Sequence, residues 1–112
     1  MSAPSNPPAN DQQERIRQTM AALWERNLPL IRDRLDELGR AAEAAATGSL
    51  DPAQRASAAG TAHKLAGSLG MFGYAQGTDL ARELEQHLET AGEADPARLQ
   101  ELARSLRAAL GF

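Results

Sequence analysis

The chain has 112 residues and a net charge of −3, and it holds 23 alanines and 15 leucines but no valine, two isoleucines and no cysteine. This length supports one domain with a modest core, and the scarcity of β-branched residues excludes a sheet, so we predict an all-α fold. The lack of cysteine excludes disulfides and thiolate metal sites and favours a reducing compartment, and the absence of a basic stripe argues against a nucleic-acid partner.

Residues 1–9 are rich in proline and polar side chains, and we predict a disordered tail there, followed by one helical domain over residues 10–112. This start has neither the basic residues nor the apolar core of a signal peptide, and no apolar run approaches the roughly 20 residues that span a bilayer. We therefore expect neither secretion nor membrane insertion, and a cytoplasmic location. Met1 and the polar start favour a free-standing protein.

The first helical region begins after Asn10 or Asp11, either of which can cap a helix. Its apolar residues recur every three or four positions, the spacing of one buried face: Ile16, Met20, Leu23, Trp24, Leu28, Ile31, Leu35 and Leu38. Because Pro29 lacks a backbone donor and disfavours helix before it, we predict a short helix to about Asn27 and a longer one over residues 28–46. A continuous kinked helix is the alternative.

The next helix is bounded by strong start and stop signals. Gly48 ends the preceding helix, Asp51 caps the new one and Pro52 suits its first turn. Two glycines within four residues predict its end near Gly70 to Gly73. Whether residues 76–78 start a helix or belong to the turn stays open.

Two leucine-striped segments complete the chain. The first stops around Gly92, and Asp95 and Pro96 then open the last helix. The leucines of the two stripes are Leu80, Leu84 and Leu88, then Leu99, Leu102, Leu106 and Leu110. The short connections predict an antiparallel four-helix bundle with an additional short N-terminal helix.

The segment from Ala62 to Gly73 places His63 among small residues. On a helix, its neighbours on the same face are too small to shield the imidazole: Ala59, Gly60, Ala66, Gly67 and Gly70. Glycine in a helix costs about 0.5–1 kcal/mol relative to alanine, so this stripe indicates close approach by a partner. The alternative is that the glycines let two helices of this chain pack tightly around a half-buried histidine.

This run resembles the signature of the histidine-containing phosphotransfer (HPt) domain. The matching positions are Ala62, His63, Leu65, Gly67, Ser68 and Gly73, and the resemblance extends over residues 11–112. The family commonly has a lysine three residues after the histidine, where this chain has Ala66. Lys64 lies only one residue on, rotated by about 100° around the helix, so it is a weak substitute that is equally consistent with a surface charge. The altered lysine position leaves open the alternative that this chain is an inactive relative of the family.

The resemblance implies reversible phosphoryl transfer between His63 and the aspartate of a response-regulator receiver domain. Imidazole has an ordinary pKa of about 6.5, so at neutral pH much of it carries a free lone pair. If Nε2 attacks, an acceptor at Nδ1 fixes the tautomer. Glu85 matches the family position of that acceptor. The alternative is that Glu85 is an ordinary exposed glutamate of a helix. If the register is off by one residue, Gln86 is the acceptor instead.

The implied partners are a receiver domain and a hybrid histidine kinase, with Mg²⁺ on the receiver, and we expect a monomer. The docking surface would combine Ala59, Ala66, Gly67 and Gly70. We expect no cofactor on this chain and, without a Walker-type loop, no ATP-dependent kinase activity. A zinc site has little support, because the residues it would need lack paired ligand spacing: His63, His87 and Glu83 or Glu89.

Three other classes of protein are less consistent with this sequence. A phosphate-independent helical interaction module is the main alternative, and it would bind its partner equally well after His63→Gln. A histidine kinase dimerisation pair usually has an acidic residue after the histidine and a proline soon after, where this chain has Lys64 and Ser68. A hydrolytic bundle is remote, because Ser68 lies about 140° around the helix from His63.

Overall fold

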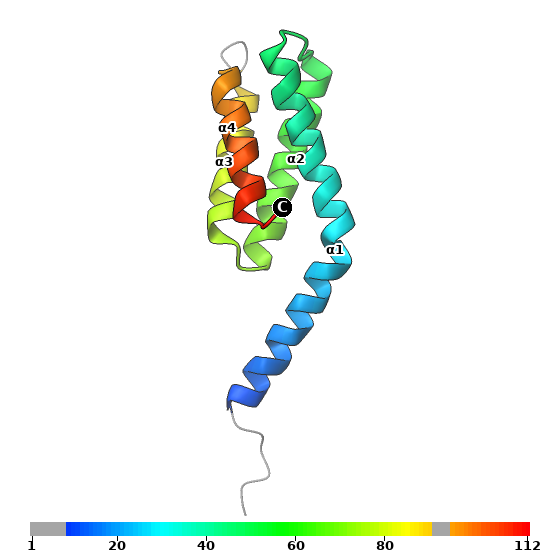
Figure 1. Cartoon of the computed structure of the whole chain (residues 1–112), viewed down its shortest axis with the longest axis vertical. Helices are drawn as coiled ribbons and strands as arrows, with labels where there is room; N and C mark the ends of the chain where they lie inside the picture. The colour runs from blue at the N-terminus through cyan, green and yellow to red at the C-terminus, as the bar shows by residue number, and fades with distance from the viewer. Residues whose placement is uncertain (1–8, 91–94) are drawn as a thin grey trace, which may run out of the picture.

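The computed structural model describes residues 9–90 and 95–112 of the chain. Within these residues it contains helices and turns and no strand, so the predicted all-α fold is confirmed (Figure 1). The helices are α1 Ala9–Ala46, α2 Pro52–Met71, α3 Ala75–Glu89 and α4 Pro96–Ala109. The predicted tail lies outside the described residues, except that Ala9 begins α1.

The four helices form an antiparallel bundle. Each helix packs against two neighbours, which places α1, α2, α3 and α4 in this order around the bundle, with α4 returning to α1. Successive helices run in opposite directions (Figure 1). The core is filled by large side chains that are almost completely buried: Ile31, Leu35, Leu38, Leu65, Leu69, Leu84, Leu88, Leu99, Leu102 and Leu106. The predicted leucine stripes therefore meet at the centre of the bundle.

The predicted division of the first region at Pro29 is wrong. Pro29 lies inside α1, which continues through it, as the alternative of one continuous helix expected. Figure 1 shows α1 changing direction between its blue N-terminal part and the cyan part that joins the bundle, and an internal proline is a usual cause of such a bend. Trp24 before the proline and Ile31 after it are both packed, so tertiary contacts outweigh one lost hydrogen bond.

The first turns of α1 project beyond the bundle (Figure 1). Residues 11–19 are exposed, including Ile16, whose exposed fraction is 63%, and Leu23 is also exposed. The expectation that the apolar stripe is buried along its whole length is therefore wrong at this end. The buried contacts begin at Trp24, whose ring lies 5.2 Å from that of Phe72 and 4.6 Å from that of Tyr74. Both partners lie at the end of α2 and the turn after it, so the bundle extends no further along α1.

The beginnings of α2 and α4 follow the predicted signals, whereas the predicted cap of the first helix is wrong, because α1 begins at Ala9 and includes both Asn10 and Asp11. The Asp51 side chain accepts a hydrogen bond from the backbone N–H of Gln54 at 2.6 Å, and Pro52 opens α2. Asp95 caps α4 in the same way, accepting from the backbone N–H of Ala97 at 3.0 Å. Gly73 has a φ of 82°, which permits the tight turn after α2. The two caps fix where α2 and α4 begin.

Gly77, one of the residues whose role stayed open, lies inside α3. A Cβ atom at this position would lie 3.1 Å from Leu69 Cδ1 and 3.3 Å from Leu110 Cδ2. The missing side chain therefore allows α3 to approach α2 and the end of the chain closely.

We predict that Asp51→Ala lowers the free energy of unfolding by about 1 kcal/mol, because it removes the cap of the helix that carries His63. Urea unfolding followed by circular dichroism measures this change. Asp33→Ala is the matched control, since Asp33 is an exposed aspartate within α1. Equal losses in the two variants would contradict the capping role.

Candidate functional site

His63 lies in the middle of α2 on the side that faces away from the core. Its side chain is 74% exposed. Ala62 and Leu65, on the opposite side of the helix, are completely buried, whereas Gly60 and Gly67 are exposed. The apolar side of α2 thus anchors the helix in the bundle, and the opposite side presents the imidazole to solvent.

Glu85 on α3 holds the imidazole from one side. Its Oε2 lies 3.0 Å from His63 Nδ1, and its side chain is 21% exposed. Leu84 and Leu88, which flank it on α3, are buried and fix the rotation of this helix. An ionised carboxylate only accepts hydrogen bonds, so Nδ1–H is the donor and the lone pair of a neutral imidazole lies on Nε2. The structure therefore brings together the pair that the sequence predicted, in the predicted register.

A second carboxylate stands one turn further along α3. The pKa of Glu89 is raised above its ordinary value, first because its side chain hydrogen-bonds with that of Glu85, and further by partial desolvation and the charge of Glu85. The charge of His63 acts in the opposite direction. His63, Glu85 and Glu89 therefore interact electrostatically, with both carboxyl groups coming from α3.

A hollow of about 350 Å³ lies beside the imidazole. Residues from α2 and α3 line it: His63, Ala66, Gly67, Arg82, Glu85 and Gln86. Arg82, the one cationic side chain in this lining, was not among the site residues predicted from the sequence. Its position three residues before Glu85, one turn away on the same helix, is the signal that would have found it.

The predicted docking surface needs a correction at its two alanines. Ala59 and Ala66 are buried, with exposed fractions of 9% and 4%, because α3 packs over this side of α2. Gly67 and Gly70 are exposed, and a Cβ atom at Gly67 would find nothing within 4 Å. The open surface beside His63 is therefore formed by the glycines, and the alanines support it from within.

Two further residues of the motif point elsewhere. Lys64 is exposed at the next position around α2 and does not line the hollow. Ser68 accepts a hydrogen bond from Arg34 Nη1 on α1 at 3.2 Å. This contact directs its hydroxyl toward α1, so Ser68 belongs to the packing of α2 against α1.

The described part of the chain holds no group of three or more His, Cys, Asp or Glu side chains that could bind a metal ion. Of the residues considered for a zinc site, His87 Nε2 lies 3.9 Å from Glu83 Oε2, and Glu83 is also paired with Arg98.

None of the helices in residues 9–90 and 95–112 combines the length and apolar character needed to cross a membrane.

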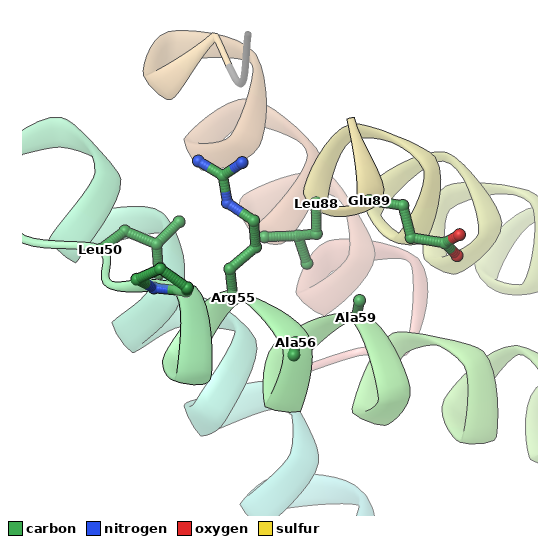
Figure 2. Close-up of a pocket in the computed structure, with 7 residues that line it drawn as sticks. Leu50, Arg55, Ala56, Ala59, Leu88 and Glu89 are labelled. Atoms are coloured by element: carbon green, nitrogen blue, oxygen red, sulfur yellow. The ribbon is translucent and has the colours of Figure 1, made fainter. Parts of the chain in front are cut away.

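A larger hollow of about 480 Å³ lies between the beginning of α2 and the end of α3 (Figure 2). Its lining is largely apolar, and Ala56, Ala59 and Leu88 contribute to it. Arg55 crosses toward α3 and donates a hydrogen bond from Nη1 to the carbonyl oxygen of Thr90 at 3.4 Å. Its charged lining residues are Arg55 and Glu89 and it contains no histidine, so the hollow that holds the candidate phosphoryl acceptor is the smaller one beside His63.

Comparisons with known proteins agree with this geometry. The family model described as Hpt domain matches residues 22–111. Protein RcaC of Microchaete diplosiphon is 34% identical over 79 residues, which are 70% of this chain and 12% of that protein. The chain thus spans about an eighth of the length of this curated relative. No solved structure gives a significant match.

The family match covers most of the chain, from before Trp24 to the end of α4, and it includes both His63 and Glu85. The four-helix bundle and the exposed histidine on α2 agree with it. The chain therefore belongs to the family of Hpt domains, the histidine-containing phosphotransfer domains of two-component signalling.

Proposed function

We propose that this chain is a phosphorelay carrier that accepts a phosphoryl group on His63 Nε2 and passes it on. The observation that carries this proposal is the 3.0 Å contact between His63 Nδ1 and Glu85 on an otherwise exposed imidazole. Such a contact holds the ring in one orientation and one tautomer, while Nε2 stays accessible to a large partner.

The transfer exchanges one bond to phosphorus for another. The Nε2 lone pair attacks the phosphorus of an aspartyl phosphate on a receiver domain, the Nε2–P bond forms, and the P–O bond to the aspartate breaks. The aspartate leaves as a carboxylate, and the ring keeps the Nδ1 proton that it shares with Glu85. The negative charge of Glu85 stabilises the resulting imidazolium. The reverse sequence returns the phosphoryl group to a receiver.

The proposed partners are receiver domains of response regulators and a hybrid histidine kinase. In this proposal Mg²⁺ belongs to the receiver, the chain binds no cofactor of its own, and it acts as a cytoplasmic monomer without ATP-dependent kinase activity. Lys64 would reach the bound phosphoryl group only through its flexible stem, so its part in the transfer is minor.

We predict that His63→Gln abolishes phosphorylation of the chain and leaves its melting temperature nearly unchanged, because the His63 side chain is mostly exposed. The assay incubates the chain with phosphorylated, Mg²⁺-loaded receiver domains and follows acid-labile label. His87→Gln is the matched control, since it removes the other histidine on the neighbouring helix. The His87→Gln variant should accept the phosphoryl group as fully as the parent chain does.

Two results would contradict the proposal. Label that persists on His63→Gln would place the phosphoryl group elsewhere. A folded parent chain that takes no label from any receiver, yet binds a receiver equally well with and without His63, would favour the phosphate-independent interaction module.

We predict that Gly67→Leu blocks transfer while the bundle stays folded. The added side chain has open space around it, but it would stand one turn from the imidazole on the surface that the receiver must approach. Glycine replacement within a helix is also intrinsically stabilising by a few tenths to about 1 kcal/mol, so the melting temperature should not fall. Gly39→Leu, at an open position on α1, is the control. Equal transfer rates in both variants would contradict the docking surface.

We predict that Glu85→Gln lowers the pKa of Glu89 toward its ordinary value of 4.5. Because Glu85 raises this pKa, the folded chain holds the Glu89 proton more tightly than the unfolded chain does. The contribution of this proton to the free energy of unfolding is fully present below the ordinary pKa of Glu89. It is lost as the pH rises through the raised pKa of the folded chain. Glu85→Gln should flatten this part of the stability profile.

An NMR titration of the Glu89 carboxyl carbon in the parent and in Glu85→Gln measures the shift directly. Glu43→Gln, which changes an exposed glutamate on α1, is the control and should leave the titration unaltered. An identical Glu89 pKa in the parent and in Glu85→Gln would show that the two carboxyl groups do not interact.

A further inference from the structure

We infer that Arg82 on α3 binds the phosphoryl group carried by His63 and neutralises part of its charge. This inference rests on the proposed function, and it adds a phosphoryl-binding residue to it. Helix α2 contributes no cation to the hollow beside the imidazole, because the residues next to His63 in its lining are Ala66 and Gly67. Arg82 reaches the same hollow from the neighbouring helix.

The position of Arg82 suits this task. It lies one turn before Glu85 on α3 and lines two adjoining hollows, the one that holds His63 and one bordered by Gly70 and Gly73. The side chain therefore stands on the open side of the site, next to the exposed glycines. Glu85 contacts the imidazole at Nδ1, so an arginine in the same hollow can reach oxygen atoms on a group attached to the ring.

The guanidinium of Arg82 is also available. Arg82 is exposed, and within residues 9–90 and 95–112 it makes no salt bridge, although Asp79 lies three residues before it. By contrast, Arg98 is paired with Glu83 and Glu101, and Arg107 is paired with Asp36. In the described residues no carboxylate is paired with Arg82, although Asp79 and Glu85 each share a hollow with it, so its guanidinium is unpaired when no phosphoryl group is bound.

A phosphoryl group on His63 needs a nearby cation, because its negative charge lies close to two carboxyl groups. A phosphoryl group carries close to two negative charges near pH 7, and here it would be attached to a ring that already lies beside Glu85, with Glu89 one turn away. Phosphoryl transfer depends mainly on positioning and charge neutralisation. A guanidinium donates two parallel N–H bonds to phosphate oxygens, which an ammonium group cannot do. Arg82 donates hydrogen bonds only, and the bonds made and broken at phosphorus are unchanged.

The test uses a small phosphoryl donor, phosphoramidate, so that binding of the phosphoryl group is separated from docking of a receiver. The parent, Arg82→Ala and Arg82→Lys are phosphorylated in this way, and a ³¹P NMR titration gives the pKa of the phosphoryl group on His63. Arg104→Ala, at an exposed arginine of α4, is the matched control, and Lys64→Ala tests the other nearby cation. Circular dichroism confirms that each variant is folded.

We expect Arg82→Ala to raise the pKa of the phosphoryl group, because a nearby cation favours its dianion. The rate of phosphoryl acceptance should fall roughly tenfold. Arg82→Lys should restore part of both effects, and Arg104→Ala should match the parent. Lys64→Ala should change the phosphoryl pKa and the rate less than Arg82→Ala does, in keeping with its minor part in the transfer.

A phosphoryl pKa that does not move in Arg82→Ala overturns the inference, and impaired transfer from a receiver alone would then assign Arg82 to docking. A parent chain that carries no phosphohistidine, with the donor active on a control protein, would refute the proposed function itself and the role of Arg82 with it.

Discussion

The packing of α2 against α3 is the contact on which the site depends. Helices approach most closely where the side chains between them are small, and α2 turns Ala59, Ala62 and Ala66 toward its neighbours, where all three are buried. Gly77 extends this close approach to the beginning of α3, where Leu69 would otherwise be displaced. At this separation a glutamate on α3 reaches an imidazole on α2 without leaving the helix surface. The burial that stabilises the bundle therefore also creates the hydrogen bond that orients His63.

The opposite side of α2 is held by polar contacts with α1. Glu37 accepts hydrogen bonds from the hydroxyl groups of Ser57 at 2.7 Å and Thr61 at 2.8 Å, and Arg34 donates to Ser68. Each of these contacts is specific in geometry, whereas leucine packing alone tolerates some rotation of a helix. They fix the rotation of α2 about its axis, and this rotation decides that His63 faces solvent.

The charges around His63 are divided between the two sides of the imidazole. The carboxyl groups of Glu85 and Glu89 both come from α3, and Glu85 contacts Nδ1. On the open side, glycines leave room for a partner, and the one cation of the hollow is contributed by Arg82. Negative charge at Nδ1 favours an imidazolium, while positive charge in the hollow favours an anion on Nε2. Both charges complement the same charge distribution, a ring that is cationic and carries an anion on Nε2, which is the distribution proposed for the phosphorylated chain.

The sequence by itself determined the helical fold, the caps of α2 and α4 and the candidate histidine, because these depend on local chemistry: periodic leucines, Asp51 and Asp95 before prolines, and small residues around His63. It also placed Glu85 in the correct register, through its resemblance to a known family. Tertiary structure alone decided that α1 runs through Pro29, since contacts on both sides of the proline outweigh its local preference. It decided as well that Ala59 and Ala66 are buried, and that the face of α3 which Arg82 shares with Glu85 borders the hollow beside His63. Such features depend on how close two helices lie and how they are rotated, which no spacing within a single helix encodes.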